Sequence, residues 1–480
     1  MAYNHLTLHT DKYQINMMYA HWLHGTWKNR AVFDVYFRKL PFGNGYAVFA
    51  GLERVVKYVQ SLRFDDEEID YLSKQEENYQ EEFLLELRNF RFKGDLYAVP
   101  EGTLVFANEP LIRVEAAIFE AQLLETAILN FTNYQTLVAT KASRIKQVAP
   151  HDSLLEFGTR RAQEADAAVW GARAAYIAGF HATSNLRAGM LFDIPTKGTH
   201  AHSWVQAHDT EEEAFNRYAE ALPDHVTLLV DTYDTLKSGV PNAIKAAKRL
   251  EKAGKRMSAI RLDSGDLAYL SKMARKMLDD AGFPYVKIVA SNDLDENIMF
   301  NLKAQGAQID IWGVGTRLIT ATDNPALGGV YKLVAREQAG ECVPVIKISG
   351  NPEKVTNPGI KELYRIINKK TGKAEADYIA LHHEQDVRRG ERIKLFDPIH
   401  PYLAKYIENY EAVCLLEPIF RAGEVVYALP PLDQTRVYHQ EQMHLFWPEY
   451  LRKLNPEVYP VDLSTAAWQL KMDLIQKYNV

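Results

Sequence analysis

The sequence has little cysteine and no long apolar run. Only two of its 480 residues are cysteines, Cys342 and Cys414, and they lie far apart in different surroundings. This excludes a disulfide framework and a cysteine-rich zinc site. No stretch approaches the ~18 consecutive apolar residues that cross a bilayer, and the polar residues 1–13 lack the apolar core of a signal peptide. We therefore expect a cytoplasmic protein with reduced thiols and no membrane partner.

A strong net charge is also missing. The formal charge is −6 at pH 7, and the isoelectric point is near 6.2. Proteins that bind nucleic acid usually show a basic patch or a high isoelectric point, so no nucleic-acid partner is expected. The charge balance still permits a local pocket for a small anion.

Short apolar runs alternate with helical patterns between residues 154 and 334. Strands are predicted at 154–157, 181–183, 204–205, 226–230, 258–262, 286–290, 309–312 and 330–334. Helices are predicted at 165–178, 240–253, 268–281 and 295–305. This alternation indicates parallel βαβ units, and so many strands favour an α/β barrel over a doubly wound sheet. Before this region, residues 116–146 read as one or two helices with an interruption at 130–133.

Polar residues follow five of the predicted strands at their carboxyl ends. The runs are Gly-Thr-Arg-Arg at 158–161, Asp-Thr-Tyr-Asp at 231–234, Arg-Leu-Asp-Ser-Gly-Asp at 261–266, Ser-Asn-Asp at 291–293 and Gly-Val-Gly-Thr at 313–316. In parallel barrels the active site lies at these strand ends. Any one run could simply cap a helix. Capping does not need arginines, however, so the five runs together indicate an active site.

The residue types in these runs suit a phosphorylated ligand. Arg160, Arg161 and Arg261 offer planar forks for phosphate, and the backbone amides of the glycine-rich turn at 313–316 can cradle a phosphate monoester. Leu318 stands where a dinucleotide-binding turn would have a third glycine, and no P-loop motif is present. Four aspartates can hold Mg²⁺ or stabilise a developing cation: Asp231, Asp234, Asp263 and Asp266. We expect a site for a multiply phosphorylated sugar bound with Mg²⁺.

Residues 198–203, Gly-Thr-His-Ala-His-Ser, contain two histidines within three positions. An extended strand would place His200 and His202 on one side, as in a metal pair. The alternative is a polar loop whose histidines are satisfied by hydrogen bonds. No third ligand follows at a suitable spacing, so no metal ligands are assigned.

Five motifs together resemble the nicotinate phosphoribosyltransferase family, and they occur in that family's order. They are Thr-Asp-Lys-Tyr-Gln at 10–14, Glu-Phe-Gly-Thr-Arg-Arg at 156–161, the 198–203 stretch, Ile-Arg-Leu-Asp-Ser-Gly-Asp at 260–266 and Gly-Val-Gly-Thr at 313–316. The resemblance implies an N-terminal α+β domain at 1–115 and an irregular TIM-like α/β barrel with the active site at 116–345. It implies that the C-terminal portion, 346–480, packs near the N-terminal domain. It also implies a homodimer with active sites at the subunit interface.

The reaction that the resemblance implies joins nicotinate to 5-phosphoribosyl-1-diphosphate (PRPP). The products are nicotinate mononucleotide and diphosphate, in NAD biosynthesis. ATP is a co-substrate in this family, Mg²⁺ is the expected cofactor, and ATP hydrolysis is coupled through a phosphohistidine. The position that matches the phosphohistidine is His202.

Site roles carry over residue by residue. Phe157 is expected to stack on the pyridine ring while Tyr13 of the partner subunit covers the other face, because two aromatic faces suit a flat heteroaromatic base. His202, Arg261 and Asp263 are the expected catalytic residues. The further substrate-binding residues are Arg160, Ser184, Thr199, Asp231, Ser291, Gly315 and Thr316.

Ser184 bears on the choice of base. Relatives that use nicotinamide resemble the stretch around Ser184 but carry an aspartate there, which accepts a hydrogen bond from the amide. An aspartate would repel a carboxylate, whereas a serine can donate to it. The serine therefore favours nicotinate over nicotinamide.

Other functions remain open on the sequence alone. A nicotinamide- or quinolinate-specific transferase would use a similar set of motifs. A barrel glycosidase could pair two of Asp231, Asp263 and Asp266, although three arginines at strand ends suit phosphate better than a neutral sugar. A binding role without catalysis is a third class.

Overall fold

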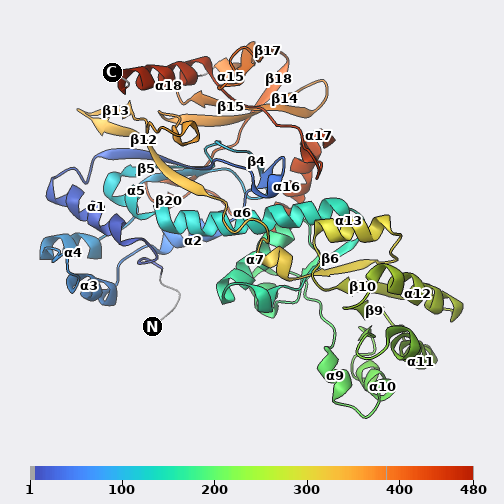
Figure 1. Ribbon diagram of the computed structural model, residues 1–480. Coiled ribbons are helices and arrows are strands. Elements are labelled where there is room, and N and C mark those ends of the chain that lie inside the picture. Colours follow the sequence, from blue (N-terminus) through green and yellow to red (C-terminus); the bar gives the residue numbers. More distant parts are fainter. Residues whose placement is uncertain (1–5, 385, 479–480) are drawn as a thin grey trace. The chain divides into compact units, whose positions relative to one another are not determined.

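The computed structural model describes residues 6–384 and 386–478, and the chain divides into two compact units. Unit 1 contains the residues up to 137 and those from 326 onward, and unit 2 is formed by residues 138–325. The colours of Figure 1 follow this order along the chain. The sequence-based boundaries at 115 and 345 stay predictions. The first five residues of the polar N-terminal stretch lie outside the described part.

Unit 2 is built on a parallel sheet, which has six strands within the described residues, in the order β7-β6-β11-β10-β9-β8 (Figure 1). The strands are β6 (Ser153–Glu156), β7 (Ala182–Thr183), β8 (Thr227–Leu229), β9 (Ala259–Leu262), β10 (Lys287–Ser291) and β11 (Ile311–Val314). β6 pairs with both β7 and β11, so the first and last strands of the unit are neighbours. The parallel register places the carboxyl ends of the strands at one edge.

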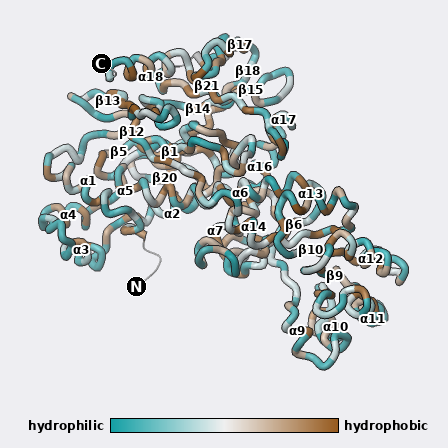
Figure 2. The backbone as a smooth tube through the Cα atoms, in the orientation of Figure 1, coloured by the Kyte–Doolittle hydropathy of each residue, from teal (hydrophilic) through white to brown (hydrophobic). Residues whose placement is uncertain are grey.

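Helices follow most of these strands, as βαβ units require. They are α7 (Ala165–Ile177), α8 (Leu186–Phe192), α9 (His202–Gln206), α10 (Glu211–Ala221), α11 (Val240–Lys252), α12 (Leu267–Asp280), α13 (Glu296–Ala304) and α14 (Thr316–Ile319). A 3-10 turn at Thr159–Arg161 and a π-helical turn at Thr235–Gly239 precede α7 and α11. In Figure 2, apolar and polar residues alternate along α11 and α12. This is the pattern of amphipathic helices with one buried face.

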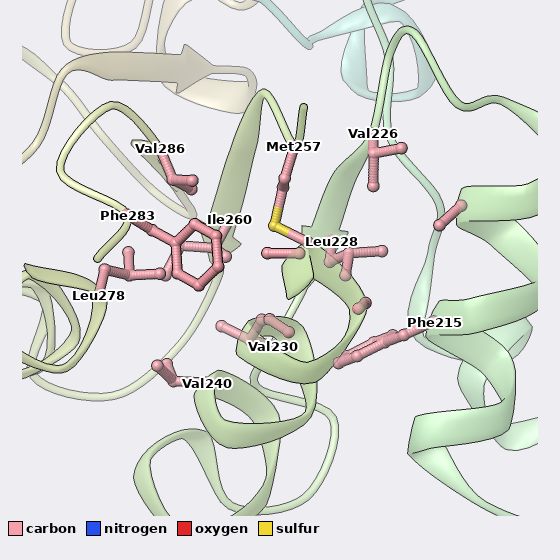
Figure 3. Close-up of a cluster of buried hydrophobic side chains, with 14 of the residues drawn as sticks. Phe215, Val226, Leu228, Val230, Val240, Met257, Ile260, Leu278, Phe283 and Val286 are labelled. Atoms are coloured by element: carbon pink, nitrogen blue, oxygen red, sulfur yellow. The ribbon is translucent and has the colours of Figure 1, made fainter. Parts of the chain in front are cut away.

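A buried apolar cluster underlies strands β8 to β10 (Figure 3). Leu228, Ile260 and Leu262 are each fully buried in it. Side chains alternate between the two faces of a strand, so Arg261, which lies between Ile260 and Leu262, is directed away from this cluster. The core thereby fixes the strand that presents Arg261.

Unit 1 contains an antiparallel sheet, with strand order β13-β12-β1-β5-β3-β19-β20 in the described residues. Its strands are β1 (Arg30–Phe37), β3 (Asp95–Ala98), β5 (Ile112–Ala117), β12 (Gly329–Gln338), β13 (Glu341–Pro344), β19 (Glu417–Arg421) and β20 (Glu424–Val425). A second sheet has the order β18-β14-β15-β21. Its strands are β14 (Lys361–Asn368), β15 (Lys373–Leu381), β18 (Tyr410–Cys414) and β21 (Val461–Leu463).

The remaining elements of unit 1 are two strand pairs and a set of helices. The pairs are β2 (Ala47–Val48) with β4 (Leu104–Val105), and β16 (Ile393–Phe396) with β17 (Ala404–Ile407). The helices are α1 (Lys12–Leu23), α2 (Leu52–Ser61), α3 (Asp66–Ser73), α4 (Glu81–Arg88), α5 (Ile118–Leu123), α15 (Asp386–Arg389), α16 (Leu432–Leu445), α17 (Pro448–Leu451) and α18 (Thr465–Tyr478), with 3-10 turns at Pro41–Gly43 and Pro352–Lys354. The long helix α6 (Glu125–Val148) begins in unit 1 and ends in unit 2. None of the helices in the described ranges is both long and apolar enough to cross a membrane.

Two predicted elements are wrong, and one predicted strand belongs to a different sheet. Residues 204–205 belong to the helix α9 and not to a strand, and Trp204 Nε1 donates to Ala214 O at 3.0 Å. Residues 330–334 lie in β12, which pairs antiparallel with β1 in unit 1 and does not join the parallel sheet. The interruption at 130–133 is absent, because α6 is continuous there and Thr132 Oγ1 donates to Ile128 O at 2.7 Å.

Candidate active site

Most of the sequence-predicted site residues meet at the carboxyl edge of the unit 2 sheet. Arg261 is in β9, Ser291 ends β10, and Gly315 directly follows β11. The strands are in parallel register, with Ser291 beside Gly313 and Val314 beside Glu156. The side chains that end these strands are therefore held next to one another by the backbone.

Arg261 is the centre of the site's hydrogen-bond network. Its Nε donates to Ser291 Oγ at 2.8 Å, Nη1 to Thr199 Oγ1 at 2.9 Å, and Nη2 to Asp263 Oδ1 at 2.8 Å. Ser291 also donates to the same Asp263 oxygen. The planar guanidinium thus joins three separate segments of the chain, which a lysine ammonium could not do in the same geometry.

Asp231 supports the neighbouring loop. Its Oδ2 accepts from the Asp263 backbone N–H at 2.9 Å and from Ser264 Oγ at 2.6 Å. Its Oδ1 is buried and has no hydrogen-bond partner among the described residues. A buried carboxylate oxygen without a donor is costly, so this atom is a candidate contact for a cation or a substrate hydroxyl.

The other two aspartates of these runs cap helical turns. Asp234 Oδ1 accepts from the backbone N–H groups of Leu236 and Lys237, at 3.1 and 2.9 Å. Asp266 Oδ1 accepts from the Tyr269 N–H at 3.0 Å, at the start of α12. For these two residues, helix capping accounts for the polar side chain.

His202 opens the short helix α9 and is part-exposed. Its Nδ1 lies 3.1 Å from Thr232 Oγ1, and its Nε2 lies 3.9 Å from Asp263 Oδ2. When Nδ1–H donates to the Thr232 hydroxyl, the lone pair of the neutral ring is on Nε2. That nitrogen is the one directed toward Asp263, at the edge of the Arg261 network.

His200 has a different environment, although it is two residues away. It is 7% exposed, and its Nε2 accepts from the Leu229 N–H at 3.1 Å. Its Nδ1 lies 3.2 Å from Ala201 O, and its ring packs edge-on against Tyr218 at 4.8 Å. Burial lowers the pKa of His200. The backbone therefore holds a neutral ring in place.

Phe157 forms an aromatic wall beside the network. It follows β6, its N–H donates to Val314 O at 2.8 Å, and the Arg261 guanidinium carbon lies 5.6 Å from the ring centroid. The ring lies close over Gly313, where a Cβ would meet Phe157 Cδ2 at 2.6 Å and Cε2 at 2.7 Å. A Cβ on Gly315 would meet Phe157 O at 3.0 Å. Both glycines let the 313–316 turn approach this aromatic residue.

The remaining predicted site residues are not part of this network. Arg160 and Ser184 are exposed and, within the described residues, make no side-chain hydrogen bond or ion pair. Thr316 begins α14. Tyr13 belongs to α1 in unit 1 and is 47% exposed.

Two residues of the network are not among the sequence-predicted site residues. Thr232 contacts His202, and Ser264 donates to Asp231. Each directly follows an aspartate that was assigned a role, within the same polar run. A hydroxyl beside an aspartate at a strand end was the signal that could have identified both.

Family models cover most of the chain. The model of the nicotinate phosphoribosyltransferase (NAPRTase) N-terminal domain matches residues 8–133, that of the NAPRTase family 153–376, and that of the C-terminal domain 360–471. A Bacillus subtilis nicotinate phosphoribosyltransferase is 56% identical over 474 residues, covering 98% of this chain and 96% of its own. The chain belongs to the nicotinate phosphoribosyltransferase family. The resemblance found in the sequence motifs is thus confirmed.

More distant members agree. Nicotinate phosphoribosyltransferase pncB2 of Mycobacterium tuberculosis is 41% identical and covers 95% of this chain and 91% of its own. The solved structure of the human nicotinic acid phosphoribosyltransferase superposes with a TM-score of 0.87 at 30% identity, covering 97% of this chain and 99% of that chain. A nicotinate-nucleotide pyrophosphorylase from Pyrococcus furiosus, at 23% identity and a TM-score of 0.70, shares the fold. The predicted mixed α/β fold is confirmed.

Proposed function

We propose that this member of the nicotinate phosphoribosyltransferase family joins nicotinate to PRPP in NAD biosynthesis, coupled to ATP hydrolysis through a phosphohistidine at His202. One observation carries the placement of the chemistry: the Arg261 guanidinium ties Thr199, Asp263 and Ser291 together beside the Phe157 ring. A cationic fork next to an aromatic face suits an anionic, flat base and a phosphorylated sugar.

Nicotinate stacks on Phe157 in this proposal. Thr199 lies beside the base, and the exposed hydroxyl of Ser184 is free to donate to its carboxylate. Tyr13 of the partner subunit covers the other face of the ring in a homodimer. The half-exposed Tyr13 side chain is available for such a contact.

PRPP binds along the same edge. The backbone of Gly315 and the hydroxyl of Thr316 take the 5-phosphate. Arg160, which has no ion-pair partner in the described chain, is free to meet diphosphate or carboxylate oxygens together with Arg261.

The residues present fit Mg²⁺. Among the described residues, no group of three or more His, Cys, Asp or Glu side chains is suited to a metal, so we do not propose a site made of protein ligands alone. Mg²⁺ is commonly held by one or two carboxylates together with substrate phosphates. Asp231, whose Oδ1 is buried and unpartnered, and Asp263 would hold it. When bound, the ion would neutralise charge on the diphosphate.

Transfer needs no strong general base, because the pyridine nitrogen carries its own lone pair. Bond cleavage at ribose C1 passes through an oxocarbenium-like state, and the ring nitrogen forms the new bond to C1 as the bond to diphosphate breaks. Arg261 stabilises the departing charge, and Phe157 and Ser184 orient the base. Catalysis of this kind comes from positioning and charge stabilisation.

ATP is used before transfer. The Nε2 lone pair of His202 attacks the γ-phosphorus, and the bond from that phosphorus to the bridging oxygen breaks, releasing ADP. Thr232 supports this step by keeping the ring proton on Nδ1. The added phosphoryl charge then makes new hydrogen bonds at the edge of the site and tightens PRPP binding. After transfer, water attacks the phosphorus and the bond to Nε2 breaks, which releases phosphate and returns His202 to its starting state.

We also propose that unit 2 folds as an irregular TIM-like barrel. The pairing of β6 with both β7 and β11 supports it, because first and last strands become neighbours when a parallel sheet closes.

Replacing His202 tests the ATP coupling. His202→Ala should lose phosphorylation by labelled ATP and the ATP stimulation of diphosphate release, while some uncoupled transfer remains. His225→Ala, an exposed histidine of the same unit, is the matched control and should behave as wild type. Equal labelling of His202→Ala would disprove the assignment. Competition among nicotinate, nicotinamide and quinolinate in the same assay tests the choice of base.

A further inference from the structure

A buried carboxylate lies directly beside the proposed base site. Glu156 ends β6, immediately before Phe157, and is 1% exposed. Its Oε1 accepts from the Gly158 N–H, and its Oε2 accepts from Thr183 Oγ1 at 2.5 Å. The first contact lies just after the aromatic wall and the second just before Ser184. One side chain therefore holds two segments that the proposed function places around the base.

The Thr183 side of this link continues into the next loop. Thr183 Oγ1 accepts from the Asn185 N–H at 3.0 Å, and the Ser184 N–H donates to Glu156 O at 2.9 Å. β6 and β7 are in parallel register with Glu156 beside Thr183. Ser184 is thus fixed through its own backbone and through both neighbours, although its side chain is exposed.

The Phe157 side is equally constrained. A Cβ on Gly158 would lie 2.8 Å from Glu156 Oε1 and 2.6 Å from Ile319 Cβ. Only a glycine lets the carboxylate reach the backbone N–H at this position. Phe157 is therefore held by its own hydrogen bond to Val314 O and by the anchored residue that follows it.

Stability alone does not explain a carboxylate here. Glu156 has no ion-pair partner within the described residues, and burial raises its pKa, while the bonds from Thr183 and Gly158 lower it. A buried charge without a partner is costly. A neutral side chain of the same shape would be cheaper to bury, so the carboxylate points to a role in the site.

We propose that Glu156 is a positioning residue that fixes the Phe157 ring relative to Ser184, by holding the Gly158 amide with one carboxylate oxygen and Thr183 with the other. The proposal rests on the proposed function, in which Phe157 and Ser184 contact nicotinate. The pocket is then set before the base enters, and binding need not order it.

Four variants test the link. Glu156→Gln keeps an oxygen for the Gly158 N–H, but its amide group donates toward Thr183, which then loses its acceptor. Thr183→Val removes the hydroxyl at nearly constant volume, and Thr183→Ser keeps it. Glu120→Gln is the matched control: Glu120 in α5 accepts from the Lys93 N–H at 2.7 Å, and burial raises its pKa, but it belongs to unit 1.

The readout is the rate of nicotinate mononucleotide formation at varied nicotinate, with saturating PRPP and ATP. Glu156→Gln and Thr183→Val should each raise KM for nicotinate about tenfold, the loss of one hydrogen bond to a charged group, with kcat and KM for PRPP within about twofold. Thr183→Ser and Glu120→Gln should match wild type. The double variant Glu156→Gln/Thr183→Val should have a KM for nicotinate within about twofold of the higher of the two single-variant values, because both substitutions remove the same hydrogen bond.

Several results would overturn the proposal: an unchanged KM for nicotinate in Glu156→Gln, an equal rise in KM for PRPP, or additive effects in the double variant. Thermal melts show whether each variant folds, and Thr183→Val still tests the link if Glu156→Gln does not. The wild-type enzyme tests the function separately. Nicotinate mononucleotide production by wild type with no KM effect in the variants would refute the positioning role alone.

Discussion

Adding one methyl group at Gly313 should displace the aromatic wall of the site. A Cβ there would lie 2.6 and 2.7 Å from two carbons of the Phe157 ring, whereas carbon atoms in contact prefer about 3.5–4.0 Å. The ring edge must therefore move by roughly 1 Å. It cannot move freely, because the Phe157 N–H is bonded to Val314 O and the Gly158 N–H to Glu156.

The expected cost follows from that displacement. Overpacking of this kind costs about 1–3 kcal/mol, and a ~1 Å misplacement of a binding group can cost about 100-fold in rate. For Gly313→Ala we expect kcat/KM for nicotinate to fall between about 10- and 100-fold. The loss should appear in nicotinate kinetics first, because the clash is with the ring on which we propose that the base stacks.

Steady-state kinetics with nicotinate and PRPP varied in turn separate the two substrates. Gly350→Ala is the control, since no atom lies within 4 Å of a Cβ at Gly350 and its φ is not in the left-handed region. Wild-type kinetics in Gly313→Ala would show that the ring can relax without consequence. The placement of Phe157 against the base would then be wrong.

Two further changes test other parts of the site. Arg261→Lys keeps the charge but loses the planar guanidinium that bonds three segments, so kcat/KM should fall about 100-fold or more. Arg217→Lys, at an exposed pair with Glu213, is the control. Near-normal activity of Arg261→Lys would contradict the central role of Arg261 in the hydrogen-bond network. The Tm of Glu156→Gln minus the Tm of wild type should increase as pH increases. Because burial raises the folded-state pKa of Glu156, its ionisation costs nothing below the unfolded pKa of about 4.3 and costs stability as pH rises through the folded pKa. Melts from pH 4 to 8 check this, and a constant difference in Tm would contradict it.

The strand ends of unit 2 can be predicted from the sequence because the residue patterns that mark them are local. Each of β8 to β11 is a short apolar run followed by polar residues, and the side-chain alternation around Arg261 determines which face it occupies. Parallel pairing then aligns these ends without further information. The network of Arg261, Asp263 and Ser291 follows from this alignment.

Other parts depend on contacts that no local pattern reveals. Residues 330–334 have the composition of a buried strand, but their partner is β1, about 300 residues earlier. Asn130 to Asn133 reads as a helix break, yet Phe131 is buried and Thr132 bonds back to the preceding turn. Two apolar residues at 204–205 cannot distinguish a strand from a helical turn. Tertiary packing decides all three cases.

The two histidines of the 198–203 stretch differ in whether a ring nitrogen is left unbonded. A histidine that takes a phosphoryl group or a metal must offer an unprotonated ring nitrogen. The Nε2 of His200 accepts from the Leu229 N–H, and its Nδ1 is paired with Ala201 O, so both ring nitrogens are bonded to the backbone. His202 uses only Nδ1, on Thr232, and leaves Nε2 at the edge of the Arg261 network. Metal binding by the pair would require breaking the His200 bond to β8, whereas phosphorylation of His202 alone requires no rearrangement of the strand.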